Sequence, residues 1–223
     1  MKVSVRGILF DMDGVLVSSI GSVERSWTKW AGEHGVDREL AIRMAHGRRA
    51  IETLQLLRPD LNGEEELRSL EELEMGDNRD LTILSGVQRI LQVVPPEQWA
   101  VVTSATERLA RRRLQDGGIP SPRFLVSADM VSSGKPHPEP YLMGAKLLGL
   151  RPEECLVIED AASGATAGHA AGCKVLATLF SHSIESLSAA DWIVRSLEDV
   201  HATIAGERIE VGFEPIAREV PAR

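Results

Sequence analysis

The stretch Val3-Ser4-Val5-Arg6-Gly7-Ile8-Leu9-Phe10-Asp11-Met12-Asp13-Gly14-Val15-Leu16 decides the fold. Its β-branched and apolar residues predict a buried strand over Val3–Phe10, which runs directly into Asp11 and Asp13. Residues two apart on an extended chain point the same way, so the two carboxylates share one face. Like charges this close are costly unless a cation neutralises them or one takes a proton. We therefore expect chemistry at the end of this strand, where Gly14 lets the chain turn sharply.

Two other interpretations of the aspartate pair were weighed against this one. A calcium-binding EF-hand loop is excluded, because it needs acidic residues where Val15 and Ser22 stand. The remaining alternative is that Asp11 and Asp13 are simply exposed in a turn.

Further short apolar or β-branched runs end in polar or turn residues, as buried strands do. They are Ala100–Thr103, Phe124–Val126, Cys155–Ile158, Lys174–Ala177 and Trp192–Val194. Helical patterns lie between most of them, at Glu107–Gln115, Pro138–Leu148 and Ala162–Ala171. This alternation predicts an α/β fold with a doubly wound, Rossmann-like parallel sheet. Ligands of such sheets bind beyond the carboxyl ends of the strands.

One interval breaks the alternation. Between about Ser18 and Leu84 we expect no strand, and large apolar residues recur at helical spacing. These residues are Trp27, Trp30, Ile42, Leu54, Leu57, Leu67 and Leu70. We interpret residues 18–84 as an inserted all-helical cap domain, with residues 1–17 and 85–223 forming a discontinuous catalytic core. Two crossings would join the cap to the core, which suits a hinged lid.

The composition narrows the class of protein. The net charge of −8 argues against a general nucleic-acid or membrane-surface binder. The opening residues lack the apolar core of a secretory signal, and no later run approaches the length of a membrane span. We therefore expect a cytoplasmic protein that binds no nucleic acid and no membrane, and a monomer rather than an oligomer.

Two smaller expectations concern the cysteines and the tail. Cys155 and Cys173 lie far apart in apolar surroundings, which predicts buried reduced thiols rather than a disulfide or a metal pair. The tail Gly206–Arg223 has two prolines and mixed charge, so we expect it to be loosely ordered.

A hydroxyl follows the second core strand at Ser104. Glu107 comes three residues later, and this capping-box spacing predicts that Ser104 caps a helix. The start of a helix also holds phosphate well, through free backbone N–H groups and the positive end of the dipole. Ser104 can therefore cap the helix and bind an anion.

Lys135 lies in Ser133-Gly134-Lys135-Pro136-His137-Pro138, a loop that its glycine and prolines make rigid. A nucleotide-binding P-loop is excluded, because Asp129 replaces its first glycine and Pro136 replaces its Ser or Thr. A lysine facing the aspartates would balance their charge and bind phosphate oxygens. An ordinary surface lysine is the alternative.

Glu159 and Asp160 close a later strand and bring two more carboxylates to the same sheet edge. Mg²⁺ suits such a place, because it prefers hard oxygen ligands and accepts phosphate oxygens. Gly164, Gly168 and Gly172 then recur every four residues. Their spacing predicts close packing of a helix on the sheet and does not match the dinucleotide fingerprint.

In this order, four segments closely resemble the signature motifs of the haloacid dehalogenase superfamily, in particular its phosphatases with a helical cap inserted after the first motif. The segments are Asp11–Leu16, Ser104, Gly134–Pro136 and Glu159–Asp160. Each segment is weak alone, but the ordered set is specific and the resemblance covers nearly the whole chain.

The resemblance implies a role for each acidic residue. Asp11 would be the nucleophile that forms an aspartyl-phosphate. Asp13 would be the general acid for the leaving oxygen and then the base for the hydrolytic water. Mg²⁺ would be held by the Asp11 carboxylate, the Asp13 backbone carbonyl and Asp160, with Glu159 close by or acting through water.

The resemblance also implies that Ser104 and Lys135 hold the oxygens of the transferring phosphoryl group. Thr103, one residue earlier, is the second candidate for the phosphate-binding hydroxyl. Ala105 and Gly14 complete the core residues expected to bind substrate.

Within the superfamily the sequence is most similar to the sugar- and polyol-phosphate phosphatases of the 2-deoxyglucose-6-phosphate and glycerol-phosphate types, with beta-phosphoglucomutase as a relative. The similarities lie at Ser18-Ser19, Ser26–Lys29, His46–Arg49 and Trp99–Ser104. His46, Gly47, Arg48 and Arg49 would bind the substrate from the cap. As ordinary helix-surface residues they would have no such role.

Differences between this sequence and related families rank the hypotheses about its function. Val23 and Ser18 stand where the mutases carry a hinge histidine and usually an aspartate, and true dehalogenases lack Asp13. The sequence therefore predicts a Mg²⁺-dependent phosphatase that acts on a small phosphorylated metabolite, a sugar or polyol phosphate. A phosphosugar mutase is the alternative enzyme, and a non-catalytic phosphosugar-binding module is the alternative from another class.

Overall fold

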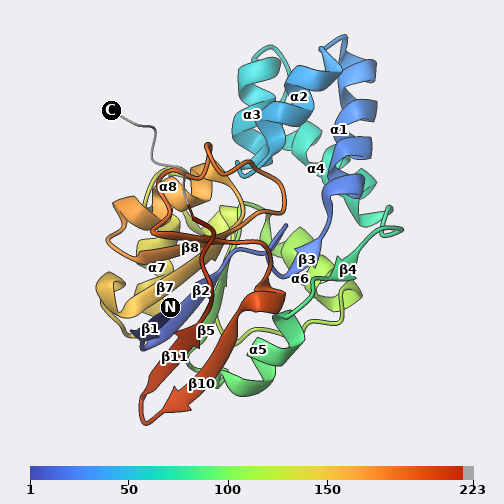
Figure 1. Ribbon diagram of the computed structural model, residues 1–223. Helices are drawn as coiled ribbons and strands as arrows, with labels where there is room; N and C mark the ends of the chain where they lie inside the picture. The colour runs from blue at the N-terminus through green and yellow to red at the C-terminus, as the bar shows by residue number, and fades with distance from the viewer. Residues whose placement is uncertain (218–223) are drawn as a thin grey trace.

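The main sheet is parallel throughout, as seen in a computed structural model that describes residues 1–217 (Figure 1). Its strands, in spatial order, are β6 (Leu125–Val126), β5 (Trp99–Val102), β2 (Gly7–Phe10), β7 (Cys155–Glu159), β8 (Lys174–Thr178) and β9 (Trp192–Val194). The chain begins this sheet at its centre with β2 and then adds strands on both sides. The predicted doubly wound α/β sheet is confirmed.

Helices cover both faces of this sheet. On one face lie α5 (Val87–Val93) and α6 (Glu107–Asp116), and on the other lie α7 (Glu139–Leu147) and α8 (Ala162–Ala170). The bounds of α6, α7 and α8 agree with the predicted helices to within one residue at each end, and α5 was not predicted. Short 3₁₀ turns at Ala128–Met130, Pro152–Glu154 and Leu197–Asp199 join other elements.

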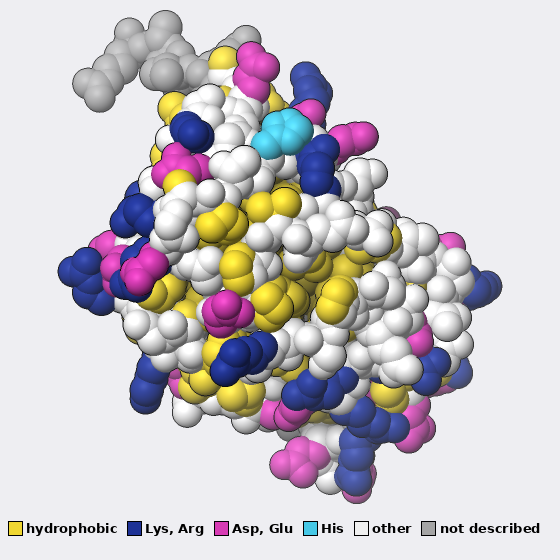
Figure 2. All heavy atoms as spheres, turned by 90° about the horizontal axis from the view of Figure 1, so that it is seen from below, with side chains coloured by type: hydrophobic (Ala, Val, Ile, Leu, Met, Phe, Trp, Pro, Cys, Tyr) yellow, Lys and Arg dark blue, Asp and Glu magenta, His cyan; other side chains and the backbone are white. Residues whose placement is uncertain are grey.

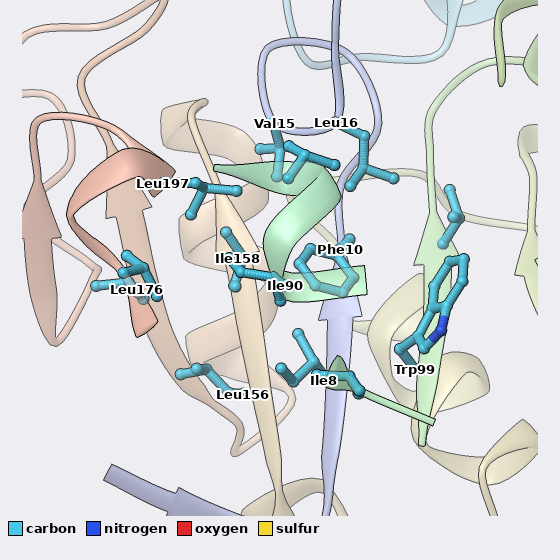
Figure 3. Close-up of a cluster of buried hydrophobic side chains, with 14 of the residues drawn as sticks. Ile8, Phe10, Val15, Leu16, Ile90, Trp99, Leu156, Ile158, Leu176 and Leu197 are labelled. Carbon is cyan, nitrogen blue, oxygen red and sulfur yellow. The ribbon is translucent and has the colours of Figure 1, made fainter. Parts of the chain in front are cut away.

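Alternation along β2 builds the two layers of the core. Ile8 and Phe10 point into the layer of α5, where Figure 3 shows them with Ile90, while Leu9 packs in the layer of α7 and α8. All three side chains are fully buried, and burying an apolar side chain of this size stabilises a fold by about 1.5–3 kcal/mol. This packing fixes the position at which the strand delivers Asp11.

Four helices between β2 and α5 form the inserted cap, which lies at one end of the sheet (Figure 1). They are α1 (Ile20–His34), α2 (Arg38–Ala45), α3 (Ala50–Leu57) and α4 (Gly63–Met75). The cap has its own apolar cluster, centred on Trp27, Trp30, Leu54 and Leu70, as the helical spacing predicted. The all-helical insert is confirmed, and its bounds at residues 18 and 84 stay a prediction.

The hinge contains two short strands that were not expected. β3 (Val17–Ser18) pairs antiparallel with β4 (Thr82–Ile83), so the two crossings between cap and core are hydrogen-bonded to each other. A strand of two residues is too short to show any hydrophobic period. It forms here because the fold brings the two crossings side by side.

The predicted single strand Val3–Phe10 is wrong, because the chain divides at Arg6 into two strands. β1 (Lys2–Val5) leaves the main sheet and pairs antiparallel with β11 (Arg208–Gly212), which also pairs with β10 (His201–Ala205). At the division the backbone N–H of Arg6 donates to the carbonyl of Glu154, at 2.8 Å. A small antiparallel sheet therefore sits at the end of the molecule opposite the cap (Figure 1).

This sheet also corrects the expectation of a loosely ordered tail. Within Gly206–Arg223, Arg208–Gly212 is regular strand, because its buried residues Ile209 and Val211 join the core. Residues 218–223 lie outside the described part of the chain. Both cysteines are free and buried, as predicted.

The surface opposite the cap carries basic and acidic side chains intermingled around hydrophobic ones (Figure 2). Among residues 1–217, no helix has the length and the apolar character that crossing a membrane requires.

Candidate active site

The carboxyl ends of β2, β5 and β7 are neighbours, and each delivers polar residues to one place. A cavity of about 750 Å³, counting the part open to solvent, lies there between core and cap. Its core lining includes Asp11, Asp13, Thr103, Ser104, Ala105, Arg113, Asp160, Ser181 and His182, and its cap lining includes Val23, Trp27, His46, Gly47, Arg48 and Glu74. The cap therefore closes over the edge where the sequence predicted chemistry.

Asp11 is held at the end of β2 in a largely buried position, 8% exposed. Its backbone N–H donates to the carbonyl of Ile158 on β7, at 2.9 Å. Burial raises the pKa of the Asp11 carboxyl from 3.8 to about 7, and Lys135 acts in the opposite direction. A nearby cation therefore decides whether this carboxyl is ionised.

Lys135 supplies one such cation from beneath the cavity. Its ammonium donates to Asp11 at 2.6 Å, to Glu159 at 2.7 Å and to the carbonyl of Val102 at 3.0 Å. Burial alone would lower the pKa of Lys135, but the two carboxylates raise it above its usual value. The alternative of an ordinary surface lysine is excluded, since Lys135 is 3% exposed.

Glu159 lies at the bottom of the site and has a donor on each carboxylate oxygen. Oε1 accepts from Lys135 and from the hydroxyl of Tyr141, at 2.7 Å each. Oε2 accepts from the backbone N–H groups of Asp160, at 2.9 Å, and Ala161, at 3.0 Å. Glu159 therefore orients the lysine and the Asp160 turn.

The carboxylates of Asp11, Glu159 and Asp160 fit a divalent cation by their geometry and charge. Each offers an oxygen within 4.8 Å of the others, and all three residues are buried. Burial, followed by the charges of Glu159 and Asp11, raises the pKa of Asp160 well above its ordinary value. Lys135 balances only one of these negative charges, and hard carboxylate oxygens are the ligands that Mg²⁺ prefers.

Gly14 belongs to this cluster rather than to the wall of the cavity. Its φ is +85°, and a Cβ built there would lie 2.0 Å from an oxygen of Asp160. Only glycine therefore allows the turn after β2 to pass so close to the Asp160 carboxylate.

The three residues after β5 line the cavity together. The hydroxyl of Thr103 accepts from the backbone N–H of Ala105, at 3.1 Å, while the hydroxyl of Ser104 donates to the carbonyl of Gly47 in the cap, at 3.3 Å. The prediction that Ser104 caps the helix is wrong. Thr106 is the cap, because it immediately precedes α6 and accepts from the N–H of Leu109.

The predicted cap residues divide into two groups. His46, Gly47 and Arg48 line the cavity. Arg49 does not: its guanidinium donates to the carbonyls of Val131 and Ser132, at 2.9 Å each. Arg49 therefore joins the cap to the loop that leads to Lys135 and is not among the residues that line the cavity.

Several residues that were not singled out surround the predicted ones. The carboxylate of Asp13 accepts from Ser19 at 2.6 Å and from Arg113 at 2.9 Å. The hydroxyl of Ser181 donates to Asp160, and His182 lies beside it on the same loop. Arg113 is the last of three consecutive arginines on α6. It differs from the other two in being buried, which depends on the side of the helix that it occupies.

The fold and this site define a class of enzymes in which a helical cap covers an acidic centre at the edge of a parallel sheet. The chain matches the haloacid dehalogenase-like hydrolases over residues 5–172. This chain belongs to that family.

Two of the similar proteins are named as phosphatases. Hexitol phosphatase A of Escherichia coli K12 is 38% identical over 203 residues, which cover 89% of this chain and 94% of the relative. Glycerol-1-phosphate phosphohydrolase 2 of Saccharomyces cerevisiae is 32% identical over 214 residues, which cover 90% and 86%. A crystal structure of beta-phosphoglucomutase from Clostridium difficile has a TM-score of 0.73 at 26% identity and covers 87% and 92%. The chain is a hydrolase of the phosphomonoesterase class.

Proposed function

We propose that the protein hydrolyses a small sugar or polyol phosphate in two steps, through a phosphoryl group carried on Asp11. The observation that carries the proposal is the contact between Asp11 and Lys135. A lysine on the attacking carboxylate favours its ionised form and also offers a positive charge to the incoming phosphoryl oxygens.

In the first step a carboxylate oxygen of Asp11 attacks the phosphorus, and the bond from phosphorus to the leaving oxygen breaks. Asp13, two residues along, gives its proton to that oxygen. In the second step Asp13 takes a proton from water, which attacks the phosphorus and releases inorganic phosphate. Asp11 is then free for the next turnover.

The phosphoryl oxygens would be bound by Lys135 and by the residues after β5. Thr103 and Ser104 both face the cavity, and the helix that follows adds the positive end of its dipole. When bound by Asp11, the Asp13 carbonyl and Asp160, Mg²⁺ supplies positive charge that lets two anions approach each other.

The cap favours a small substrate, because it closes over a cavity of only about 750 Å³, counting the part open to solvent. His46, Arg48 and Trp27 from the cap face the same space as Asp13. Polar and aromatic groups of this kind bind the hydroxyls and ring faces of sugars and polyols. The two named phosphatases among the relatives support this substrate class.

The alternative of a phosphosugar mutase is less well supported at one position. Val23 lines the cavity with an apolar side chain where the mutases have a hinge histidine. Incubation with beta-glucose 1-phosphate and a trace of the 1,6-bisphosphate separates the two enzymes. We expect inorganic phosphate, whereas accumulation of glucose 6-phosphate would favour the mutase.

The test of the proposal is Asp11→Asn, which keeps the shape of the side chain and removes its charge. We expect no release of phosphate from any ester, with an unchanged melting temperature or a higher one. Full activity in this variant would overturn the proposal. A screen of hexitol, glycerol and hexose phosphates in the wild-type protein then ranks the substrates by kcat/KM, and binding without release across the panel would favour a non-catalytic module.

The need for Mg²⁺ has its own test. Chelation should abolish phosphate release, and added Mg²⁺ should raise the melting temperature by neutralising the buried carboxylates. The Asp160→Asn variant should lose most of this thermal shift. Activity that survives both chelation and this substitution would contradict the proposed role of the metal.

A further inference from the structure

The carboxylate of Asp13 is held on both oxygens. Oδ1 accepts from the hydroxyl of Ser19, at 2.6 Å, and Oδ2 accepts from Nη1 of Arg113, at 2.9 Å. Ser19 precedes the first helix of the cap, and Arg113 lies on α6 of the core. The orientation of Asp13 is therefore determined from both sides of the cavity.

Arg113 also reaches the cap with its other amino group. Nη2 donates to Glu74 of α4, at 2.7 Å, and the side chains of Arg113 and Glu74 are each 7% exposed. One guanidinium thus joins Asp13 in the core to a buried carboxylate that moves with the cap. Its fixed planar fork sets the angle between the two contacts, which a lysine cannot do.

The two partners of Asp13 differ in what they can do with a proton. A guanidinium has only donors, so Oδ2 of Asp13 must remain an acceptor. The hydroxyl of Ser19 can donate or accept, so Oδ1 can carry a proton and still keep its hydrogen bond. The arrangement assigns the mobile proton of Asp13 to Oδ1.

A purely structural role for Arg113 is less well supported, because the same two helices have another junction nearby. The hydroxyl of Thr106, the residue that caps α6, donates to Glu71 on α4, and Arg108 of α6 approaches Glu71 at 3.9 Å. These contacts join cap and core without touching Asp13. Among the residues of α6, Arg113 alone hydrogen-bonds both to Asp13 and to the cap.

We propose that Arg113 is a positioning residue, which fixes the Asp13 carboxyl with Oδ1 toward the leaving oxygen and couples that geometry to cap closure through Glu74. The inference rests on the proposed function, since it assumes that Asp13 protonates the leaving oxygen. That proton passes from Oδ1 to the oxygen as its bond to phosphorus breaks, and Oδ2 stays on the guanidinium.

The leaving group provides the readout. An alkoxide leaving group, as from glycerol 1-phosphate, needs a proton in the transition state, whereas p-nitrophenolate does not. We compare kcat/KM for these two esters, because this constant covers only the steps up to departure of the leaving group. Variants are Arg113→Gln, Arg113→Lys and Glu74→Gln, and Glu71→Gln is the matched control on the same face of α4.

For Arg113→Gln we expect kcat/KM to fall about 10²-fold for the alkyl ester and less than about 10-fold for the aryl ester, since a positioned acid contributes about 10²–10⁴-fold. Arg113→Lys and Glu74→Gln should show the same preference with a smaller loss. Glu71→Gln should change both esters equally and by less than about 3-fold.

Equal losses on both esters in Arg113→Gln would overturn the inference and reduce Arg113 to a cap–core ion pair or a substrate ligand. If that variant does not fold, the ester ratio in Arg113→Lys decides in its place. The proposed function is tested separately, because Asp11→Asn should abolish both activities whatever the result at Arg113.

Discussion

The ammonium of Lys135 lies 2.6 Å from the carboxylate of Asp11, and the two side chains are only 2% and 11% exposed. Little water can therefore solvate either charge if its partner is removed. Without Lys135, Asp11 would be a buried, uncompensated ion, whereas Lys135 without Asp11 would keep Glu159 as its partner.

Replacement of Lys135 by Met should lower the free energy of unfolding by about 3 kcal/mol, because Asp11 and Glu159 lose their shared cation. It should also reduce kcat by more than about 10²-fold, as loss of a donor to a developing negative charge does. Urea unfolding and phosphate release measure the two effects. The control is Lys146→Met on the exposed side of α7, which should change stability by less than about 0.5 kcal/mol. A fully active Lys135→Met protein would contradict the proposed role of Lys135 in turnover.

Gly47 should tolerate no side chain, because two separate conditions meet there. Its φ is +72°, and a Cβ would lie 2.5 Å from the hydroxyl of Ser163, which now donates to the Gly47 carbonyl at 2.9 Å. We expect Gly47→Ala to prevent full closure and to lower kcat/KM by at least about 10-fold, equivalent to about 1.4 kcal/mol.

The matched control is Gly35→Ala at the end of α1. Gly35 has a similar φ of +65° but nothing within 4 Å of an added Cβ. It should lose about 1–2 kcal/mol of stability from the left-handed backbone alone and keep its activity. Equal kinetics in the two variants would show that the contact between Gly47 and the core has no part in turnover.

Gly164 lies in the first turn of α8, close to the Glu159 carboxylate. A Cβ at Gly164 would overlap the Glu159 carboxylate, 1.6 Å from Oε1, whereas the exposed helical Gly32 has nothing within 4 Å. Gly164→Ala should therefore displace Glu159 and destabilise the protein by about 3 kcal/mol or more. Gly32→Ala should stabilise it by up to about 1 kcal/mol. Thermal melts of both variants test the contrast.

The pKa of Glu74 predicts a dependence of stability on pH. Burial raises this pKa from 4.5 to about 6, with Arg113 acting in the opposite direction. Between these pH values the native state keeps a proton that the unfolded chain has released, so the contribution of Glu74 to stability falls as pH rises. The full loss amounts to at most about 2 kcal/mol.

Urea unfolding across this pH window, for wild type and Glu74→Gln, isolates the effect. The wild-type stability should fall relative to the variant as pH rises through the pKa of about 6. Glu72→Gln, on the exposed side of the same helix, should follow the wild-type curve. A constant difference between wild type and Glu74→Gln at every pH would refute the raised pKa.

The strand-end residues of the site could be predicted from the sequence, and the residues on helix sides could not. Asp11 and Asp160 follow strands directly, so the sheet alone brings them together. Lys135 was found through its rigid loop and its place in the family motif. Arg113 lies far from any strand end, and its use of two carboxylates depends on how the cap helix α4 docks on α6, which no local pattern encodes.

Two local errors have similar causes. The sequence pattern runs without a break through Arg6, but the strand divides there because β11, about two hundred residues later, offers β1 a different partner. Ser104 has the spacing of a capping residue, but its hydroxyl is used by Gly47 of the cap, and Thr106 takes the capping role. In both places a long-range contact overrides a local preference.

The pairing of β1 with β11 has a consequence for synthesis on the ribosome. The first strand to emerge must wait for Arg208–Gly212 before its hydrogen bonds can form, and β2 waits for β5 and β7 on either side. The apolar cluster of the cap, in contrast, lies within residues 23–70, so it can form while the rest of the nascent chain is still being made. β1 therefore stays unpaired longest, and the apolar central strand β2 stays exposed until β5 and β7 have been made.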